Sequence, residues 1–79
     1  MKSRPQESWT VGELAGRFGL ATHVLRFWEE MGLLTPARDA GGRRRYGSDD
    51  LTRVAVTIRN KAAGMSLEQI RVLLDADAA

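Results

Sequence analysis

The sequence predicts a winged helix-turn-helix, a mainly α fold with a small β-hairpin wing, in the order helix, helix, hairpin, helix, helix. Two short helical patterns lie on either side of Gly19-Leu20, and an arginine-rich hairpin pattern follows directly over 35–46. Two further helical patterns complete the 79 residues. A chain of this length holds one small domain, which we place over 9–76, between a flexible lead at 1–8 and a tail at 77–79.

The first two helices are delimited by capping residues. Thr10 can cap the first helix through its hydroxyl while Glu13 reaches back to the Thr10 backbone, which makes a capping box. Gly19 is placed to end this helix in the left-handed conformation. The second helix is expected over about 22–31, and Gly32 follows as its end.

The hairpin is expected to turn at Gly41-Gly42, where the glycines supply positive backbone φ angles. Because side chains alternate along a strand, Arg43 and Arg45 should face one side of the hairpin. Arg44 should share the other side with Tyr46, which is expected to pack against the helices. One of the two pairs should meet phosphate or the minor groove. The alternative is a solvated basic loop, but three adjacent arginines after a glycine turn exceed what such a loop requires.

Two further helices are expected after the hairpin. Ser48 should cap the third helix, and Gly64 should end it. Its apolar positions recur at helical spacing at Leu51, Val54, Ala55, Ile58 and Ala62. Ser66 and Gln69 predict a second capping box at the start of the fourth helix, and the chain over 75–79 is expected to trail off. The inward positions of the fourth helix are expected to be Leu67, Ile70, Leu73 and Leu74.

Charge is distributed unevenly, although the formal net charge is only +2. From Arg38 to Lys61 there are seven basic and three acidic residues, whereas from Ser66 onward the acidic residues outnumber the basic ones by two. This pattern indicates one face for a polyanion and another that faces away from it. Ten of the twelve cations are arginines, whose guanidinium groups suit bidentate contacts to phosphate and to guanine edges.

Composition excludes several classes of protein. The chain has no cysteine, and therefore no disulfide and no thiolate metal site, and its single histidine cannot build a metal site alone. No apolar run is long enough to span a bilayer, and the polar start at 1–8 lacks the apolar core of a signal peptide. No nucleophile, base and orienting group can be assembled, so an enzyme is not expected. We expect a cytoplasmic, nucleoid-associated protein without a cofactor or metal.

The second helix holds candidate contacts to DNA. A winged helix-turn-helix enters the major groove with one helix and clamps the flanking backbone with its hairpin. Thr22, His23 and Arg26 could supply contacts to base edges and phosphates. The alternative is that Phe27 and Trp28 belong to the core and that Arg26 pairs with a carboxylate. For Trp28 we expect a packed ring with its indole N–H free to donate, and His23 taken alone is an ordinary exposed residue.

Arg59 and Lys61 form a third candidate region, near the end of the third helix. The third and fourth helices also make a helix-turn-helix pair. This pair could place either cation, together with backbone amides at the start of the fourth helix, on a phosphate. An ordinary exposed basic face explains the same residues equally well.

Taken together, these motifs resemble the DNA-binding domain of the MerR family of bacterial transcription regulators. The resemblance covers roughly Trp9 to Leu74. The segments that support it are Thr10–Ala15, Leu25–Leu34, Pro36–Arg38, Gly42–Tyr46, Asp50-Leu51 and Gly64–Ile70.

The resemblance implies a winged helix-turn-helix whose second helix pair acts as a second wing. It implies that the helix with His23, Arg26 and Phe27-Trp28 sits in the major groove of double-stranded DNA. The hairpin arginines and the Arg59 and Lys61 region would then grip the backbone. Family members bind inverted repeats in promoters as dimers, and bend and untwist over-long spacers so that RNA polymerase can use them.

The chain departs from the family pattern at several positions. Ala21 stands where a serine usually caps the recognition helix, so Thr22 is expected to cap it instead. Phe27 has no hydroxyl, so a phosphate contact from that position is lost. Family members continue into a dimerisation helix and an effector or metal domain, whereas this chain stops at Ala79. We therefore expect an excised domain or a minimal member, with a homodimer only in a longer form.

Two other functions remain open at this point. An excisionase-like architectural protein shares the winged fold and bends DNA. It would form head-to-tail filaments on direct repeats, whereas a regulator would form a dimer on a palindrome. A protein-interaction module would dock on polymerase or a sigma factor through Leu73-Leu74 and neighbouring residues. Its function would survive replacement of the arginines at 43–45.

Overall fold

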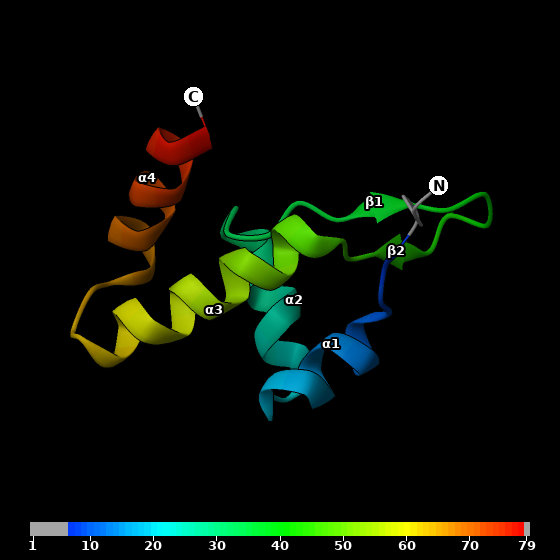
Figure 1. Ribbon diagram of the computed structural model, residues 1–79, viewed down its shortest axis with the longest axis horizontal. Coiled ribbons are helices and arrows are strands. Elements are labelled where there is room, and N and C mark those ends of the chain that lie inside the picture. The colour runs from blue at the N-terminus through cyan, green and yellow to red at the C-terminus, as the bar shows by residue number, and fades with distance from the viewer. Residues whose placement is uncertain (1–6, 79) are drawn as a thin grey trace.

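The computed structural model describes residues 7–78 and confirms the predicted order of four helices and one hairpin (Figure 1). The elements are α1 (Val11–Phe18), α2 (Thr22–Glu30), β1 (Ala37–Arg38), β2 (Arg44–Arg45), α3 (Ser48–Ala62) and α4 (Leu67–Ala78). In Figure 1, α2 lies near the centre, the hairpin extends to one side, and α4 stands at the far end of α3. Most of the predicted flexible lead, residues 1–6, lies outside the described residues.

The helix-turn-helix formed by α1 and α2 is set by local capping. The predicted capping box is present, because Glu13 N–H donates to the Thr10 hydroxyl at 3.1 Å and Thr10 N–H donates to the Glu13 carboxylate at 2.9 Å. Gly19 ends α1 with φ 69°, as predicted. The prediction that Thr22 caps α2 was wrong: extended Ala21 is the N-cap, makes no side-chain hydrogen bond there, and leaves Thr22 as the first helical residue. The helix ends at Glu30, one residue earlier than expected.

The hairpin turn is organised by Asp39 as well as by glycine. The two strands pair antiparallel, with Arg38 opposite Arg44. The Asp39 carboxylate accepts hydrogen bonds from the backbone N–H groups of Gly41 at 2.9 Å and Arg43 at 3.0 Å. Of the two turn glycines only Gly42 has a positive φ, 81°, so the prediction was wrong for Gly41. The turn is therefore stabilised by hydrogen bonds to the Asp39 carboxylate and by one glycine with positive φ, where the sequence predicted two such glycines.

The residues just before α1 attach to the outer side of the hairpin. The backbone of Trp9 pairs with that of Tyr46 through two N–H to O bonds of 2.8 Å each. The Arg45 guanidinium donates to the hydroxyl of Ser8 at 3.0 Å and to its carbonyl at 3.2 Å. The contacts of the hairpin therefore reach Ser8, one residue before the predicted start of the domain at residue 9.

One core joins all four helices to the hairpin. Its buried side chains are Leu14, Ala15, Leu25, Trp28, Leu33, Leu34, Tyr46, Val54, Ile70 and Leu74. The buried face of α3 differs from the apolar pattern, because Asp50 and Thr57 are buried with Val54 while Ala55 and Ala62 are exposed. The Thr57 hydroxyl is satisfied by the carbonyl oxygen of residue 53 at 2.7 Å, which makes its burial tolerable.

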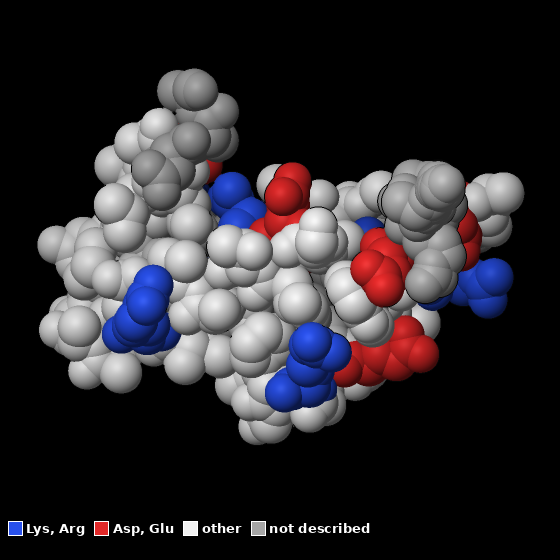
Figure 2. Space-filling model, in the orientation of Figure 1, with Lys and Arg blue, Asp and Glu red and all other residues white. Residues whose placement is uncertain are grey.

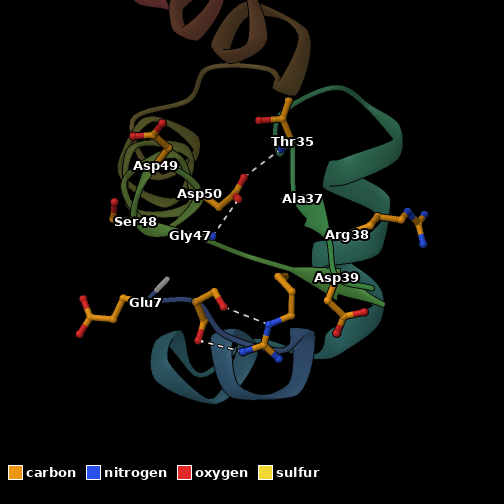
Figure 3. A pocket seen from close by; sticks show the side chains of 11 residues that line it. Glu7, Thr35, Ala37, Arg38, Asp39, Gly47, Ser48, Asp49 and Asp50 are labelled. Carbon is orange, nitrogen blue, oxygen red and sulfur yellow. Dashed lines mark hydrogen bonds between the residues drawn. The ribbon is translucent and has the colours of Figure 1, made fainter. Parts of the chain in front are cut away.

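Asp50 ties the start of α3 to the entry of the hairpin. Its two carboxylate oxygens accept hydrogen bonds from Thr35 N–H at 2.9 Å and Gly47 N–H at 3.2 Å (Figure 3). Gly47 is the N-cap of α3 and Ser48 is the first helical residue, so the predicted Ser48 cap was wrong. The Asp50 side chain takes over that role because it lies three residues into the helix and can reach back to the cap.

The last helix begins as predicted and ends later. Ser66 and Gln69 form the expected capping box, with hydrogen bonds of 2.9 and 3.1 Å. Leu73 is 42% exposed, so its inward assignment was wrong, and the helix continues to Ala78 where the chain was expected to trail off. Arg53 holds this end of the molecule together, because it donates to the carbonyl of residue 33 at 2.7 Å and lies 3.7 Å from the carboxylate of residue 75.

Candidate nucleic-acid interface

The helix α2 presents most of its predicted contact residues to solvent. His23, Arg26 and Phe27 are exposed, and Thr22 is partly buried at the start of the helix. Among the described residues, Arg26 has no ion pair and no side-chain hydrogen bond. Trp28 is only 7% exposed, so its ring is packed in the core as expected, and it supports the helix from behind. A part for Trp28 in DNA binding stays a prediction.

Arg26 and the hairpin arginines share one groove. A groove of about 410 Å³ lies between α2, the start of α1 and the hairpin. It is lined by Thr10, Val11, Arg26, Arg38, Gly42, Arg43, Arg44 and Arg45. The fold thus brings a cation of the second helix to four cations of the hairpin. Sequence reasoning had left Arg38 out of the candidate site, although its position opposite Arg44 in the strand pairing places it beside the others.

The three consecutive arginines are not equivalent. The Arg43 side chain is 84% exposed, and its nearest anionic partner is the Asp39 carboxylate at 3.5 Å. Arg44 donates from Nε to both carboxylate oxygens of Glu29, at 2.8 and 3.0 Å. Arg45 donates to the hydroxyl and the carbonyl oxygen of Ser8. Only Arg43 therefore points its charge into solvent with a weak protein contact.

Tyr46 lies on the same side as Arg44, as strand alternation predicted. Its ring is fully buried, and its hydroxyl donates to the Glu29 carboxylate at 3.1 Å. Burial and the neighbouring carboxylate raise the pKa of Tyr46 to about 12, so the phenol is neutral and remains a donor near pH 7. The hydrogen bond to Glu29 likewise raises the pKa of Arg44. Tyr46 has no exposed surface and packs against the helices, as expected, so any part it has in DNA binding is through the position of the hairpin.

Arg59 and Lys61 are exposed on the last turn of α3, away from the arginine groove. A rise of 1.5 Å per residue puts Arg59 about 17 Å along the helix from Ser48. In Figure 1 this end of α3 and the hairpin lie on opposite sides of α2. The structure therefore does not gather the predicted cations in one place, but distributes them on both sides of the central helix.

Charges elsewhere on the molecule are mixed. The face in Figure 2 has scattered side chains of both signs around a broad uncharged centre. A second hollow of about 540 Å³, at the base of the hairpin, is lined by acidic residues including Glu7, Asp39 and Asp49 as well as by Arg38 and Arg45. The Arg38 side chain points away from this hollow (Figure 3). Because this hollow is lined by both acidic and basic residues, it is a poor match for a polyanion, in contrast to the arginine groove.

The described part of the chain holds neither a membrane-crossing helix nor a metal cluster. Over residues 7–78, no helix combines the length and apolar character that crossing a membrane requires. Within the same residues, no three histidine, cysteine, aspartate or glutamate side chains come together as a potential metal site.

The family assignment follows from comparison with known proteins. Residues 9–77 match the family described as MerR HTH family regulatory protein. The chain belongs to the MerR family. The MerR match covers most of the chain and confirms the resemblance inferred from the motifs. It favours a transcription regulator over the excisionase-like and protein-interaction hypotheses.

Individual relatives agree with the MerR assignment. The chain is 43% identical over 65 residues to an HTH-type transcriptional activator SoxR homolog of Chromobacterium violaceum, covering 82% of this chain and 44% of that protein. It is 42% identical over 65 residues to a probable heavy metal-dependent transcriptional regulator of Haemophilus influenzae, covering 81% of this chain and 51% of that one. The chain thus spans about half the length of these curated relatives.

A solved structure supports the fold and the type of domain. HiNmlR, a MerR family regulator lacking the sensor domain and bound to promoter DNA, superposes with a TM-score of 0.82 at 30% identity. The match covers 91% of this chain and 58% of that one. A MerR family regulator from Bacillus cereus gives a TM-score of 0.80 at 29% identity, over 86% of this chain and 52% of that one. The chain is a winged helix-turn-helix DNA-binding domain of the MerR type.

Proposed function

We propose that this domain binds a promoter operator with α2 in the major groove and the hairpin on the phosphate backbone. The observation that carries the proposal is the groove in which Arg26 of α2 lies beside the hairpin arginines. Five of the residues that line this groove are arginines, one from α2 and four from the hairpin, and such a concentration of positive charge attracts a polyanion. The relative whose structure was solved on promoter DNA shares this fold.

The exposed residues of α2 are proposed to read the bases. Arg26 would donate to a guanine edge, and His23 and Thr22 would contact bases or phosphates near the start of the helix. Phe27, which is 49% exposed, would pack against an apolar base edge such as a thymine methyl group. Trp28 would act indirectly, by holding the helix against the core.

The hairpin and the end of α3 are proposed to hold the backbone on either side of α2. Arg43 is the principal phosphate contact of the hairpin, because its side chain is the least engaged by the protein. Arg44 and Arg45 add positive charge and hold the hairpin in place. Arg59 and Lys61 would meet phosphates beyond the opposite end of the recognition helix. Their separation from the hairpin suits contacts on both flanks of one major groove.

The complete regulator is proposed to work as a homodimer on an inverted repeat, in a form longer than this chain. Dimeric binding would distort the promoter so that RNA polymerase can use it. This activity places the protein in the cytoplasm with the nucleoid, and it requires binding and deformation of DNA without catalysis. The single domain is expected to be monomeric or weakly dimeric, which sedimentation of the purified chain measures.

Selection of bound sites from a random DNA pool tests the proposal. The purified chain is used at near-physiological salt, and bound sequences are recovered and compared. Enrichment of a half-site, alone or as an inverted repeat, supports sequence-specific binding and gives the half-site spacing. Binding without enrichment that vanishes as salt rises would reduce the interaction to non-specific electrostatic attraction and would refute the operator proposal.

A further inference from the structure

The carboxylate of Glu29 joins the recognition helix to the hairpin. Glu29 lies in the last turn of α2, and both of its oxygens accept from Arg44 Nε, at 2.8 and 3.0 Å. One of these oxygens also accepts from the Tyr46 hydroxyl at 3.1 Å. The two donors belong to the return strand of the hairpin and its continuation. One side chain of α2 is therefore bonded to two successive inward-facing side chains of the hairpin.

Glu29 forms no hydrogen bond or ion pair with Arg26 among the described residues, although both belong to α2. The two residues are three positions apart, and side chains at this spacing are neighbours on a helix surface. Glu29 could therefore have paired with Arg26, but its partners in the structure are Arg44 and Tyr46. The carboxylate neutralises a hairpin arginine, while the cation proposed to read bases stays without a partner among the described residues.

The contact is partly shielded from solvent. The Glu29 side chain is 21% exposed and that of Arg44 is 41% exposed, so water and salt screen the pair less than a fully exposed one. Tyr46 is anchored independently, because its ring is in the core and its backbone pairs with Trp9. The hairpin is thus fixed to α2 at one point and to the rest of the core at another.

We infer that Glu29 is a positioning residue for DNA binding, which fixes the hairpin against α2 before DNA arrives. The inference rests on the proposed function. With Arg44 and Tyr46 bonded to Glu29, the groove between Arg26 and Arg43 keeps one shape in the free protein. A hairpin already in its binding position loses less conformational freedom when the complex forms, so affinity is higher. Glu29 itself contributes no contact to DNA.

The substitution Glu29→Gln tests this role. Glutamine keeps the size of the side chain and an acceptor for Tyr46, but it loses the charge that holds Arg44. Glu30→Gln is the matched control, because Glu30 is the next residue of the same helix, is exposed, and has no ion pair among the described residues. Both variants lose one negative charge close to the proposed interface, so a difference between them reports the contact with the hairpin.

We expect Glu29→Gln to weaken binding to the site selected by the wild-type chain by about three- to tenfold. The dependence of affinity on salt should stay unchanged, because no phosphate contact is lost. Glu30→Gln should not weaken binding. The assay runs well below the unfolding midpoint of every variant, which circular dichroism provides. A purely structural role would lower that midpoint and leave the Kd of the folded protein unchanged.

Arg44→Gln and the double variant, Glu29→Gln with Arg44→Gln, complete the test. If Glu29→Gln does not fold, Arg44→Gln is measured in its place. If Arg44 acts through Glu29, each single variant should weaken binding and the double variant should be no weaker than either. Tighter or unchanged binding by Glu29→Gln would overturn the inference. So would a salt slope reduced by about 0.9 in Arg44→Gln, which would show that Arg44 contacts a phosphate. Absence of binding by the wild-type chain would instead refute the proposed function.

Discussion

Replacing all three hairpin arginines by alanine should flatten the salt dependence of DNA binding hardly more than replacing Arg43 alone. Each phosphate contact contributes about 0.9 to the slope of log affinity against log salt, so three contacts would contribute about 2.7. In the structure, Arg44 and Arg45 are bonded to protein oxygens at 2.8–3.2 Å, whereas Arg43 is 84% exposed. We therefore expect a slope change near 0.9, as an order of magnitude, for both the single and the triple variant.

The assay is fluorescence anisotropy with a labelled duplex that contains the selected site, from about 50 mM to about 200 mM salt. Over this fourfold range a slope change of about 0.9 alters the salt-induced loss of affinity by about 3.5-fold, which is readily measured. The triple variant should also bind more weakly at every salt concentration, because its hairpin is no longer held by Glu29 and Ser8. Arg71→Ala is the control: Arg71 lies on α4, 3.1 Å from the Asp75 carboxylate and outside the groove.

Two results would refute this reasoning. A triple variant whose slope falls by about 2.7 would show that Arg44 and Arg45 leave their protein partners and meet phosphates in the complex. An unchanged slope in Arg43→Ala would remove the exposed tip of the hairpin from the interface. The first result would overturn the division of roles within the hairpin, and the second would overturn the proposed placement of the hairpin on DNA.

Three further predictions concern single positions. Arg26→Ala should change the selected sequence and weaken binding to the original site by about 1–3 kcal/mol, and a collapse of helicity and melting temperature would instead make Arg26 structural. Gly42→Ala should lower the free energy of unfolding by about 1–2 kcal/mol in chemical denaturation, because φ is 81° there, whereas a similar loss in Gly41→Ala would contradict the turn geometry. The raised pKa of Tyr46 should make wild-type stability fall as pH rises from the ordinary phenol value of 10.0 to about 12, since the unfolded chain ionises first. Tyr46→Phe should lack this alkaline loss in pH-dependent unfolding, and a similar loss would assign it to another group.

The features predicted correctly are those whose cause lies within a few residues. The capping box of Thr10 and Glu13 is closed by side chains three positions apart, and that of Ser66 and Gln69 has the same spacing. The left-handed end at Gly19 likewise needs only a residue without a Cβ. Such signals are complete in the local sequence, so tertiary packing does not change them.

The features that sequence reasoning missed depend on partners far along the chain. Asp50 accepts a hydrogen bond from a backbone N–H fifteen residues away, and Arg53 donates to a carbonyl twenty residues away. Both looked like ordinary members of a charged helix. Glu29 was similarly indistinguishable from Glu30, and only the fold shows that one meets the hairpin while the other faces solvent. Two local signals could have been found. Aspartate two residues before a backbone N–H favours the turn at Asp39, and an acidic residue three positions after a helix cap favours the bond from Gly47 to Asp50.

The three hairpin arginines differ in how strongly the protein itself binds their guanidinium groups. A count of charges suggests three equivalent phosphate contacts, but two of the three guanidinium groups satisfy oxygens of the protein itself. Arg44 is bonded to Glu29 of α2, and Arg45 is bonded to Ser8. A hairpin with only two residues per strand has little stability of its own, so these two contacts help to fix its orientation relative to the helices. Glu29, Arg44 and Tyr46 are joined by hydrogen bonds, so we expect the effect of a substitution at any of them on DNA binding to depend on the other two.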